Sequence, residues 1–171
     1  MLPPFLLLVG TISCTDQGET LPSRHISTDA ELFHIVTVDQ PFLNYNLFPG
    51  ADSVTSGTLN GSTAHQPLVR VSMNTTAFQA LNNGRLPAGS GFPDGSIIFK
   101  QIRHGTETDL YAIIYKDPDN PLAGNGWLWA EIRPDGTPFI SLTLGGRNCT
   151  GCHARELGPL NDFVRTFERQ H

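Results

Sequence analysis

The sequence is poor in charged residues and has no long apolar run. Charged residues make up 16% of the 171 residues, and the net charge is −5. A nucleic-acid-binding surface needs clustered Lys and Arg, so this balance argues against nucleic acid as a partner. No stretch reaches the roughly 18 consecutive apolar residues of a transmembrane helix. The length suits one domain, and 17 Gly with 13 Pro favour many turns and short strands.

Cysteine is also scarce, and its placement is uneven. The three cysteines are Cys14 near the start of the chain and Cys149 and Cys152 near its end. A small secreted domain held together by disulfides would carry more cysteines, and they would lie farther apart. The C-terminal pair therefore indicates a redox pair, a metal site or a covalently held cofactor.

The start of the chain is predicted to direct export. Residues 5–12 form an apolar run with the length of a signal-peptide core, too short to span a bilayer. Small and apolar residues directly before Cys14 are typical of a bacterial lipoprotein signal, in which that cysteine carries a lipid anchor. No Lys or Arg precedes Cys14, so a plain secretory signal and a buried apolar segment stay open. We expect a leader at 1–14, a tether at 15–27 and one domain at 28–171, exported to the periplasm.

Helices are expected in three short segments, each preceded by capping residues. Thr28 and Glu31 have the spacing of a capping box. The 44–67 segment is rich in Gly, Ser and Thr without a clear period, which predicts a loop. The expected helices run from Thr28 to about Val38, from Thr76 to Gly84 after a cap at Asn74 or Thr75, and from Asp162 to Gln170.

Strand patterns dominate the second half of the chain. Short turns that contain Pro, Asp and Gly separate the last four of these segments. Close spacing of this kind predicts an antiparallel meander. The expected strands cover residues 68–74, 96–103, 110–116, 127–133 and 137–144.

The stretch Cys149-Thr150-Gly151-Cys152-His153 is compatible with three kinds of chemistry. Zinc needs four ligands, and this stretch supplies three at most. A thioredoxin-like redox pair usually opens a helix in a βαβ unit, whereas this pair follows an antiparallel meander. Haem c fits best, because two thiols at this spacing form thioethers to the haem and His153 becomes the proximal iron ligand. The histidines that would have to complete a zinc site are His25, His34, His65 and His104.

The position of the motif narrows the class of haem protein. Small electron-transfer cytochromes carry it near the N-terminus and take a methionine as the second iron ligand. Here the motif lies near the C-terminus, and Met73 falls in a strand pattern, so core packing is the better interpretation of that side chain. The four-helix cytochromes c′ carry a C-terminal motif, but their chains are helical throughout.

Five segments carry a more specific pattern. They read AHQPLVRVSMNTTAFQAL (64–81), FPDGSIIFKQI (92–102), WLWAEIRPDG (127–136), CTGCH (149–153) and NDFVRTF (161–167). In this order they resemble the cytochrome P-460 family. The resemblance implies an α+β fold with an antiparallel sheet of about five strands, flanking helices and one haem c with a five-coordinate iron.

The resemblance implies one of two functions, because the family contains two kinds of member. In the cytochromes P-460 proper, a lysine is cross-linked to the haem and the protein oxidises hydroxylamine. In the cytochrome c′-beta members that bond is absent, and the protein binds nitric oxide or carbon monoxide. We expect a binding protein for a small gaseous or nitrogenous ligand; hydroxylamine oxidation is the alternative, and electron transfer to a soluble partner a third. A homodimer agrees with the resemblance, although no face in the sequence indicates one.

Lys100 and Glu131 are the candidate catalytic residues. Alternation in the strand 96–103 puts Lys100 between two isoleucines, where desolvation would lower its pKa and leave a nucleophilic amine. That chemistry suits a haem–lysine bond; a lysine that reaches water at the sheet edge is the alternative. The other lysine, Lys116, ends its strand and is expected to be a solvated charge. Glu131 shares a face with two tryptophans, and it either serves as a base beside the bound nitrogen or meets solvent.

Other side chains are candidates for the surroundings of the haem. Phenylalanines packed over the iron would exclude water, and arginines would pair with the propionates. Core packing and surface exposure are the respective alternatives. The phenylalanines are Phe78, Phe92, Phe99 and Phe139, and the arginines are Arg70 and Arg147.

Overall fold

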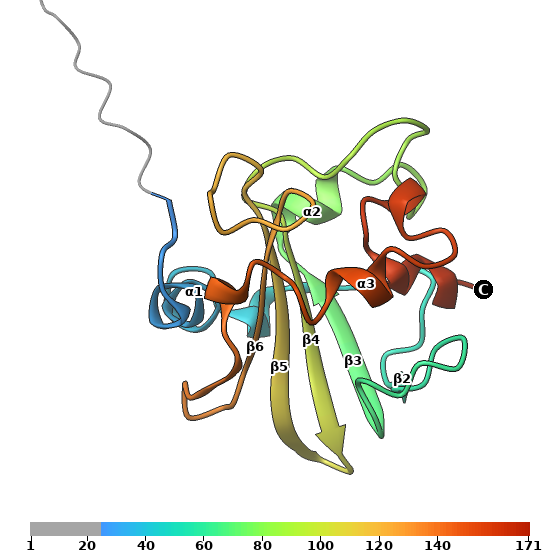
Figure 1. Ribbon diagram of the computed structural model, residues 1–171. Helices are drawn as coiled ribbons and strands as arrows, with labels where there is room; N and C mark the ends of the chain where they lie inside the picture. The colour runs from blue at the N-terminus through green and yellow to red at the C-terminus, as the bar shows by residue number, and fades with distance from the viewer. Residues whose placement is uncertain (1–24) are drawn as a thin grey trace, which may run out of the picture.

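The computed structural model describes residues 25–171. The predicted leader at 1–14 and most of the tether lie outside the described residues. The described part is an α+β domain built on one antiparallel sheet with the order β1-β3-β4-β5-β6-β7, in which β2 also pairs with β3 (Figure 1). The strands are β1 (Asn46–Leu47), β2 (Thr55–Ser56), β3 (Leu68–Met73), β4 (Ile97–His104), β5 (Glu107–Lys116), β6 (Trp127–Ile132) and β7 (Pro138–Ile140).

The helices are short, and several are of the 3-10 type. The predicted capping box is confirmed: the Thr28 hydroxyl accepts from the Glu31 N–H. Helical structure then continues to Asp39, one residue beyond the expected end. The α-helices are α1 (Asp29–His34), α2 (Thr75–Gln79) and α3 (Thr150–His153); η1 (Ile35–Asp39) is a π-helix, and η2 (Phe42–Asn44), η3 (Leu142–Leu144), η4 (Pro159–Asn161) and η5 (Arg165–Arg169) are 3-10 helices.

The register of the sheet aligns three residues in a row across β4, β5 and β6. Lys100 lies opposite Ala112, and Ala112 lies opposite Glu131. Opposed residues of antiparallel strands present their side chains to the same face. Lys100 and Glu131 therefore share one face, with backbones about 10 Å apart because strands are spaced by about 4.8 Å. The expected alternation is confirmed, since Ile98 and Ile102 are buried in the core on that face.

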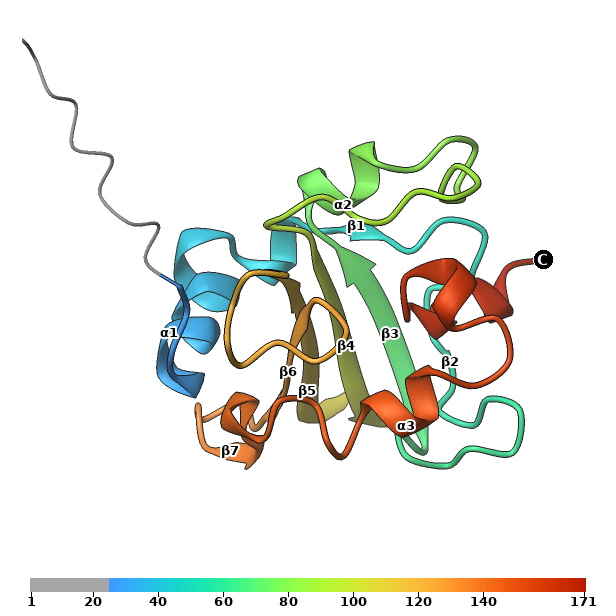
Figure 2. The same cartoon turned by 45° about the horizontal axis from the view of Figure 1, so that its top comes forward.

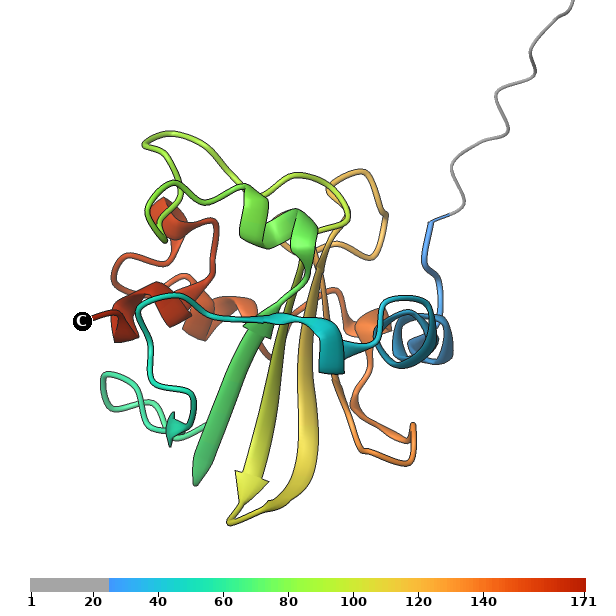
Figure 3. The same ribbon diagram turned by 180° about the vertical axis from the view of Figure 1, so that it is seen from behind.

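Different parts of the chain cover the two faces of the sheet. On one face Ile98 and Trp129 pack with Val164 from the C-terminal segment, residues 148–171. On the other face Phe99 packs with Leu32 of α1. Figure 2 shows α1 and the C-terminal segment on opposite sides of the strands, and Figure 3 shows the same separation from behind. The sheet thus divides a scaffold side, under α1, from a side that carries the cysteine motif.

One expected strand is shorter than predicted and one expected helix is wrong, and both differ at a place where a carboxylate joins residues that are far apart in the sequence. The strand 137–144 ends at Ile140, because the Leu142 N–H and the Ser141 hydroxyl donate to the carboxylate of Asp29. The final helix does not form as a continuous unit. Asp162 and the next residue have left-handed φ values of 49° and 64°, which interrupt it between η4 and η5.

Two smaller differences concern the first half of the chain. The helix at Thr75 ends at Gln79 rather than at Gly84, since the chain turns at 82–85 through paired backbone bonds between Asn82 and Arg85. The 44–67 segment is mostly loop as expected, but it contributes β1 and β2 as two-residue strands. Within residues 25–171, no helix is long and apolar enough to cross a membrane.

Candidate functional site

A cavity of about 220 Å³ lies between the sheet and the C-terminal segment. Its walls include all five residues that the sequence put forward as site residues. Apolar walls are supplied by isoleucines of β4 and β5 and by Trp129 of β6. The five are Lys100, Glu131, Cys149, Cys152 and His153.

The motif residues point into this cavity because they share one turn of helix. Cys149 is the N-cap of α3, and its carbonyl accepts from the N–H groups of Cys152 and His153. Residues three and four apart lie on the same face of a helix. The turn begins at Gly146 (φ 73°), where a Cβ atom would come within 2.5 Å of the Trp129 ring. Glycine is therefore required where α3 meets β6.

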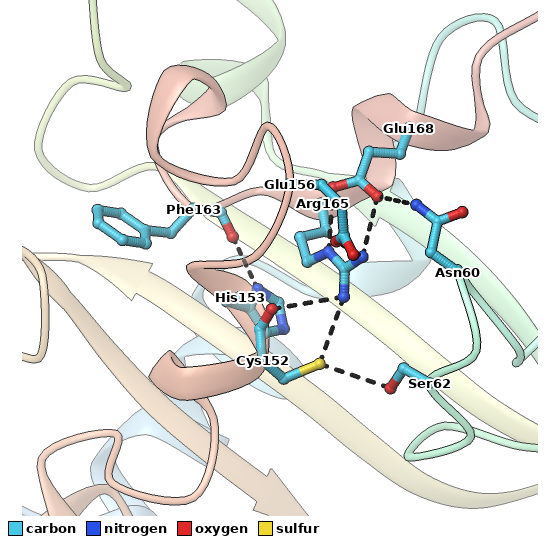
Figure 4. Close-up of polar contacts among 8 residues, drawn as sticks. All are labelled: Asn60, Ser62, Cys152, His153, Glu156, Phe163, Arg165 and Glu168. Atoms are coloured by element: carbon cyan, nitrogen blue, oxygen red, sulfur yellow. Dashed lines mark hydrogen bonds and ion pairs between the residues drawn. The ribbon is translucent and has the colours of Figure 1, made fainter.

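His153 is held in a single tautomer. Its Nδ1–H donates to the Phe163 carbonyl at 2.7 Å (Figure 4). Burial, and secondarily the charge of Lys100, lowers the pKa of His153 to about 3. The ring is therefore neutral at physiological pH and keeps a lone pair on Nε2. A histidine in this state, with its other nitrogen bonded to a carbonyl, is the usual form of a metal ligand.

The two cysteines do not have the properties of a redox pair. Both are free thiols, and burial raises the pKa of Cys149 to about 11, with Glu131 and Cys152 as smaller causes. A nucleophilic cysteine in a redox motif has a lowered pKa instead. The zinc alternative also finds no support in residues 25–171, where no three His, Cys, Asp or Glu side chains lie together as ligands.

A chain of hydrogen bonds links Lys100 to Glu131 through His65. Lys100 Nζ lies 2.9 Å from His65 Nδ1, and His65 Nε2 lies 3.2 Å from Glu131 Oε1. Because the ammonium can only donate, Nδ1 accepts and the Nε2–H donates to the carboxylate. Burial lowers the pKa of Lys100 to about 8, and the charge of Arg169 contributes in the same direction. The amine thus lies inside the cavity, as the alternation predicts, and not at the edge of the sheet.

Arg165 connects the cysteine–histidine motif (149–153) to the C-terminal 3-10 helix η5. Its guanidinium donates to the Cys152 carbonyl and Sγ, at 3.4 Å each, and it forms ion pairs with Glu156 and Glu168. The Arg165 side chain is only 5% exposed. Asn60 also donates to Glu168, so the 57–65 loop belongs to the same network (Figure 4). The charge of Arg165 is thus fixed at the cavity wall.

Several residues of the cavity were not expected from the sequence. His65, Arg165 and Arg169 all line it. Arg165 and Arg169 lie in the segment 161–167 or just after it, which carried the resemblance, and their spacing of four was the available signal. The sequence puts His65 forward only as one of four histidines that could complete a zinc site, because its loop has no periodicity that indicates a direction.

Several expected neighbours lie elsewhere. Of the four phenylalanines, Phe139 lines the cavity, Phe92 and Phe99 are buried in the two cores, and Phe78 is 41% exposed. Met73 is fully buried in a core cluster, as expected. The arginines that were expected to face propionates bind elsewhere: Arg70 donates to Gln101, and Arg147 donates to the Leu144 carbonyl.

The expectation that Lys116 is a solvated charge is wrong. Lys116 Nζ forms an ion pair with both Asp162 oxygens, at 2.8 and 2.9 Å. Both side chains are only 12% exposed. The ammonium also lies 4.9 Å from the centre of the Trp127 ring. The end of β5 is therefore largely covered by the C-terminal segment.

The donor set of the cavity fits a covalently held haem. Two thiols and one neutral imidazole with a free Nε2 lie on one helical turn, and Arg169 at the cavity wall offers a cationic partner for a propionate. The volume of about 220 Å³ is below the roughly 300–1,000 Å³ of most ligand sites. The cavity is therefore too small to enclose a macrocycle completely.

The described residues thus form an α+β domain whose cysteine–histidine motif lines a cavity on one face of an antiparallel sheet. No model of a known protein family matches the chain, and no curated protein matches it. The resemblance to the cytochrome P-460 family stays a prediction that rests on the quoted segments. The chemistry of the cavity is therefore the main indication of function.

Proposed function

We propose that the protein is an exported mono-haem c cytochrome that binds a small diatomic or nitrogenous ligand such as nitric oxide. Cys149 and Cys152 would hold the haem through thioethers, and His153 would be the axial ligand. When bound, the haem supplies an iron with an open coordination position. The observation that supports this most is the fixed tautomer of His153. Its Nδ1–H donates a hydrogen bond to a carbonyl, which leaves the Nε2 lone pair free beside two thiols.

The other residues of the cavity favour a small ligand over a large one. Isoleucines and Trp129 supply apolar walls, and the polar side chains Lys100, His65 and Glu131 are already hydrogen-bonded to one another. Arg165 is already neutralised by two carboxylates, so it adds little net charge to the interior. Burial of a charged ligand in such a site would cost desolvation free energy, whereas burial of an uncharged molecule such as nitric oxide costs little.

A second function, oxidation of hydroxylamine, is favoured by one observation. Lys100 lies in the cavity with a pKa lowered to about 8, so a substantial fraction of its amine is neutral near physiological pH. A neutral amine is the nucleophile that a haem–lysine cross-link requires. The His65–Glu131 pair beside it would accept protons released from a nitrogen substrate.

The two functions are distinguished on protein that has been matured with haem c. We expect a high-spin ferrous spectrum, stoichiometric nitric oxide binding and no turnover of hydroxylamine with an artificial electron acceptor. The intact mass should equal that of the simple haem adduct.

Other outcomes of this experiment have defined meanings. A red-shifted Soret band, together with a mass lacking the hydrogens lost on an extra bond, would support the second function. Lys100→Arg should then restore the simple adduct mass, while Lys116→Arg, the matched control, should not. A six-coordinate low-spin iron in the resting protein would contradict both functions and leave electron transfer.

A further inference from the structure

The carbonyl that holds His153 belongs to a turn with an unusual backbone. The Phe163 oxygen accepts the Nδ1–H of His153. Asp162 and Phe163 both have positive φ values, 49° and 64°. An aspartate tolerates this left-handed region, but a bulky aromatic residue rarely adopts it. Two consecutive residues in this conformation need other interactions to keep them there.

Those interactions converge on Asp162. Its carboxylate accepts from Lys116 Nζ and from the Phe92 N–H, and its carbonyl accepts from Trp127 Nε1 at 2.9 Å. The partners come from β5, from β6 and from the loop before β4, so three separate parts of the fold fix one residue. The adjacent carbonyl of Phe163 is thereby held at a set distance from His153.

Lys116 and Asp162 act from outside the cavity. Neither residue lines it, whereas His153 does. The Phe163 carbonyl that accepts from His153 belongs to the residue directly after Asp162, whose carboxylate Lys116 binds. The ion pair can therefore act on His153 through the position of that carbonyl without entering the cavity.

We propose that Lys116 and Asp162 are positioning residues for His153, and that their ion pair sets the orientation of its imidazole and the donor strength of Nε2. A carbonyl that is firmly held against Nδ1–H makes Nε2 a stronger donor to a metal. The part of the proposal that concerns iron rests on the proposed function. The part that concerns the tautomer and ring orientation is a property of the chain itself.

The first test uses the full chain produced without haem. Nitrogen-15 NMR of the histidine rings at neutral pH should show His153 of the wild type in the Nδ1–H tautomer alone. Asp162→Asn and Lys116→Met should each give a mixture of tautomers, because the carbonyl is no longer fixed. Lys116→Arg should keep the single tautomer, since it restores the ion pair. Asp29→Asn is the matched control, a carboxylate that also fixes a backbone N–H but belongs to α1, on the other side of the sheet.

The second test uses haem-loaded protein and resonance Raman spectroscopy of the ferrous iron–histidine stretch. The frequency should fall in Asp162→Asn and Lys116→Met and stay near the wild-type value in Lys116→Arg and Asp29→Asn. If folded Asp162→Asn and Lys116→Met both keep the wild-type tautomer and frequency while losing thermal stability, the pair is structural only and the proposal is wrong. If Asp162→Asn does not fold, the comparison of Lys116→Met with Lys116→Arg is enough to test the positioning role.

The two tests separate this inference from the proposed function. Mixed tautomers in the variants of a chain that never acquires covalent haem would support the positioning role and contradict haem binding. Unchanged tautomers in variants of a chain that does bind haem would overturn the positioning role alone.

Discussion

At the scale of single residues, the cavity places one amine among apolar walls and fixed charges. Lys100 donates to His65, and its nearest charges include Glu131, which favours the ammonium, and Arg169, which opposes it. Burial is the largest influence and lowers the pKa of Lys100 from 10.5 to about 8. The folded protein therefore releases this proton more readily than the unfolded chain does.

This difference predicts a pH dependence of stability. Between about pH 8 and 10.5 the unfolded chain keeps the Lys100 proton that the folded chain has lost, so stability rises as pH rises. Each tenfold change in proton affinity corresponds to about 1.4 kcal/mol, which gives a gain of about 3 kcal/mol. The free energy of unfolding of haem-free protein should show this rise in the wild type and not in Lys100→Met.

The comparison with Lys100→Met is needed because other groups also titrate in this range. Burial raises the pKa of Tyr45, Tyr111 and Tyr115, and their ionisation in the unfolded chain lowers stability near pH 10. Both proteins share these tyrosines, so the difference between their curves isolates the lysine. Identical curves would mean that Lys100 is solvated in the folded protein.

The residues of the cavity were predictable only where a local pattern indicated them. Cys149, Cys152 and His153 form a contiguous motif, and strand alternation gave the direction of Lys100 and Glu131. His65 and the two arginines enter the cavity from a loop and from a 3-10 helix. Their directions depend on contacts such as the bond between Asn60 and Glu168, which join residues 108 positions apart. No periodic pattern encodes such a contact.

At the scale of elements, Arg165 connects η5 to α3. It lies in η5, donates to the last turn of α3 at Cys152, and neutralises Glu168, whose side chain is 6% exposed. A buried carboxylate that loses its cation keeps its desolvation penalty without compensation. The position of the motif therefore depends on this one side chain.

Arg165→Gln should lower the free energy of unfolding by about 3–5 kcal/mol, because it leaves Glu168 buried without its cation. Urea denaturation of haem-free protein measures the change. Arg155→Gln is the control, since Arg155 is exposed on the same segment and should change stability by about 0.5 kcal/mol or less. Equal losses in the two variants would show that the Arg165 network does not hold the segment.

The elements were predictable where local signals agreed with the fold. The capping box at Thr28 starts α1 as expected, and alternating residues produce β3 to β6. The last predicted strand and the last predicted helix fail at Ser141 and Asp162. In both places a carboxylate forms bonds with residues far away in the sequence, and these bonds outweigh local preference.

For the whole molecule, the two faces of the sheet have different roles: one packs against α1, and the other carries the candidate site. The face under α1 is packed with aromatic and aliphatic side chains, and the opposite face carries the cavity with the cysteine motif. The α+β class and the antiparallel meander followed from strand spacing and turn residues. The sequence did not indicate which face of the sheet would receive residues 148–171, because the helical period at 162–170 belongs to a helix that does not form as one unit.

The proposed function requires that Cys149 and Cys152 hold one haem covalently, with His153 as its axial ligand. The most direct measurement is the intact mass of the denatured protein after coexpression with a haem c maturation system. The claim predicts one haem on the wild type, none on the Cys149→Ala/Cys152→Ala variant, and an altered ferrous spectrum with haem still attached in His153→Ala. Wild-type protein without haem, or a double cysteine variant that retains it after denaturation, would contradict the claim.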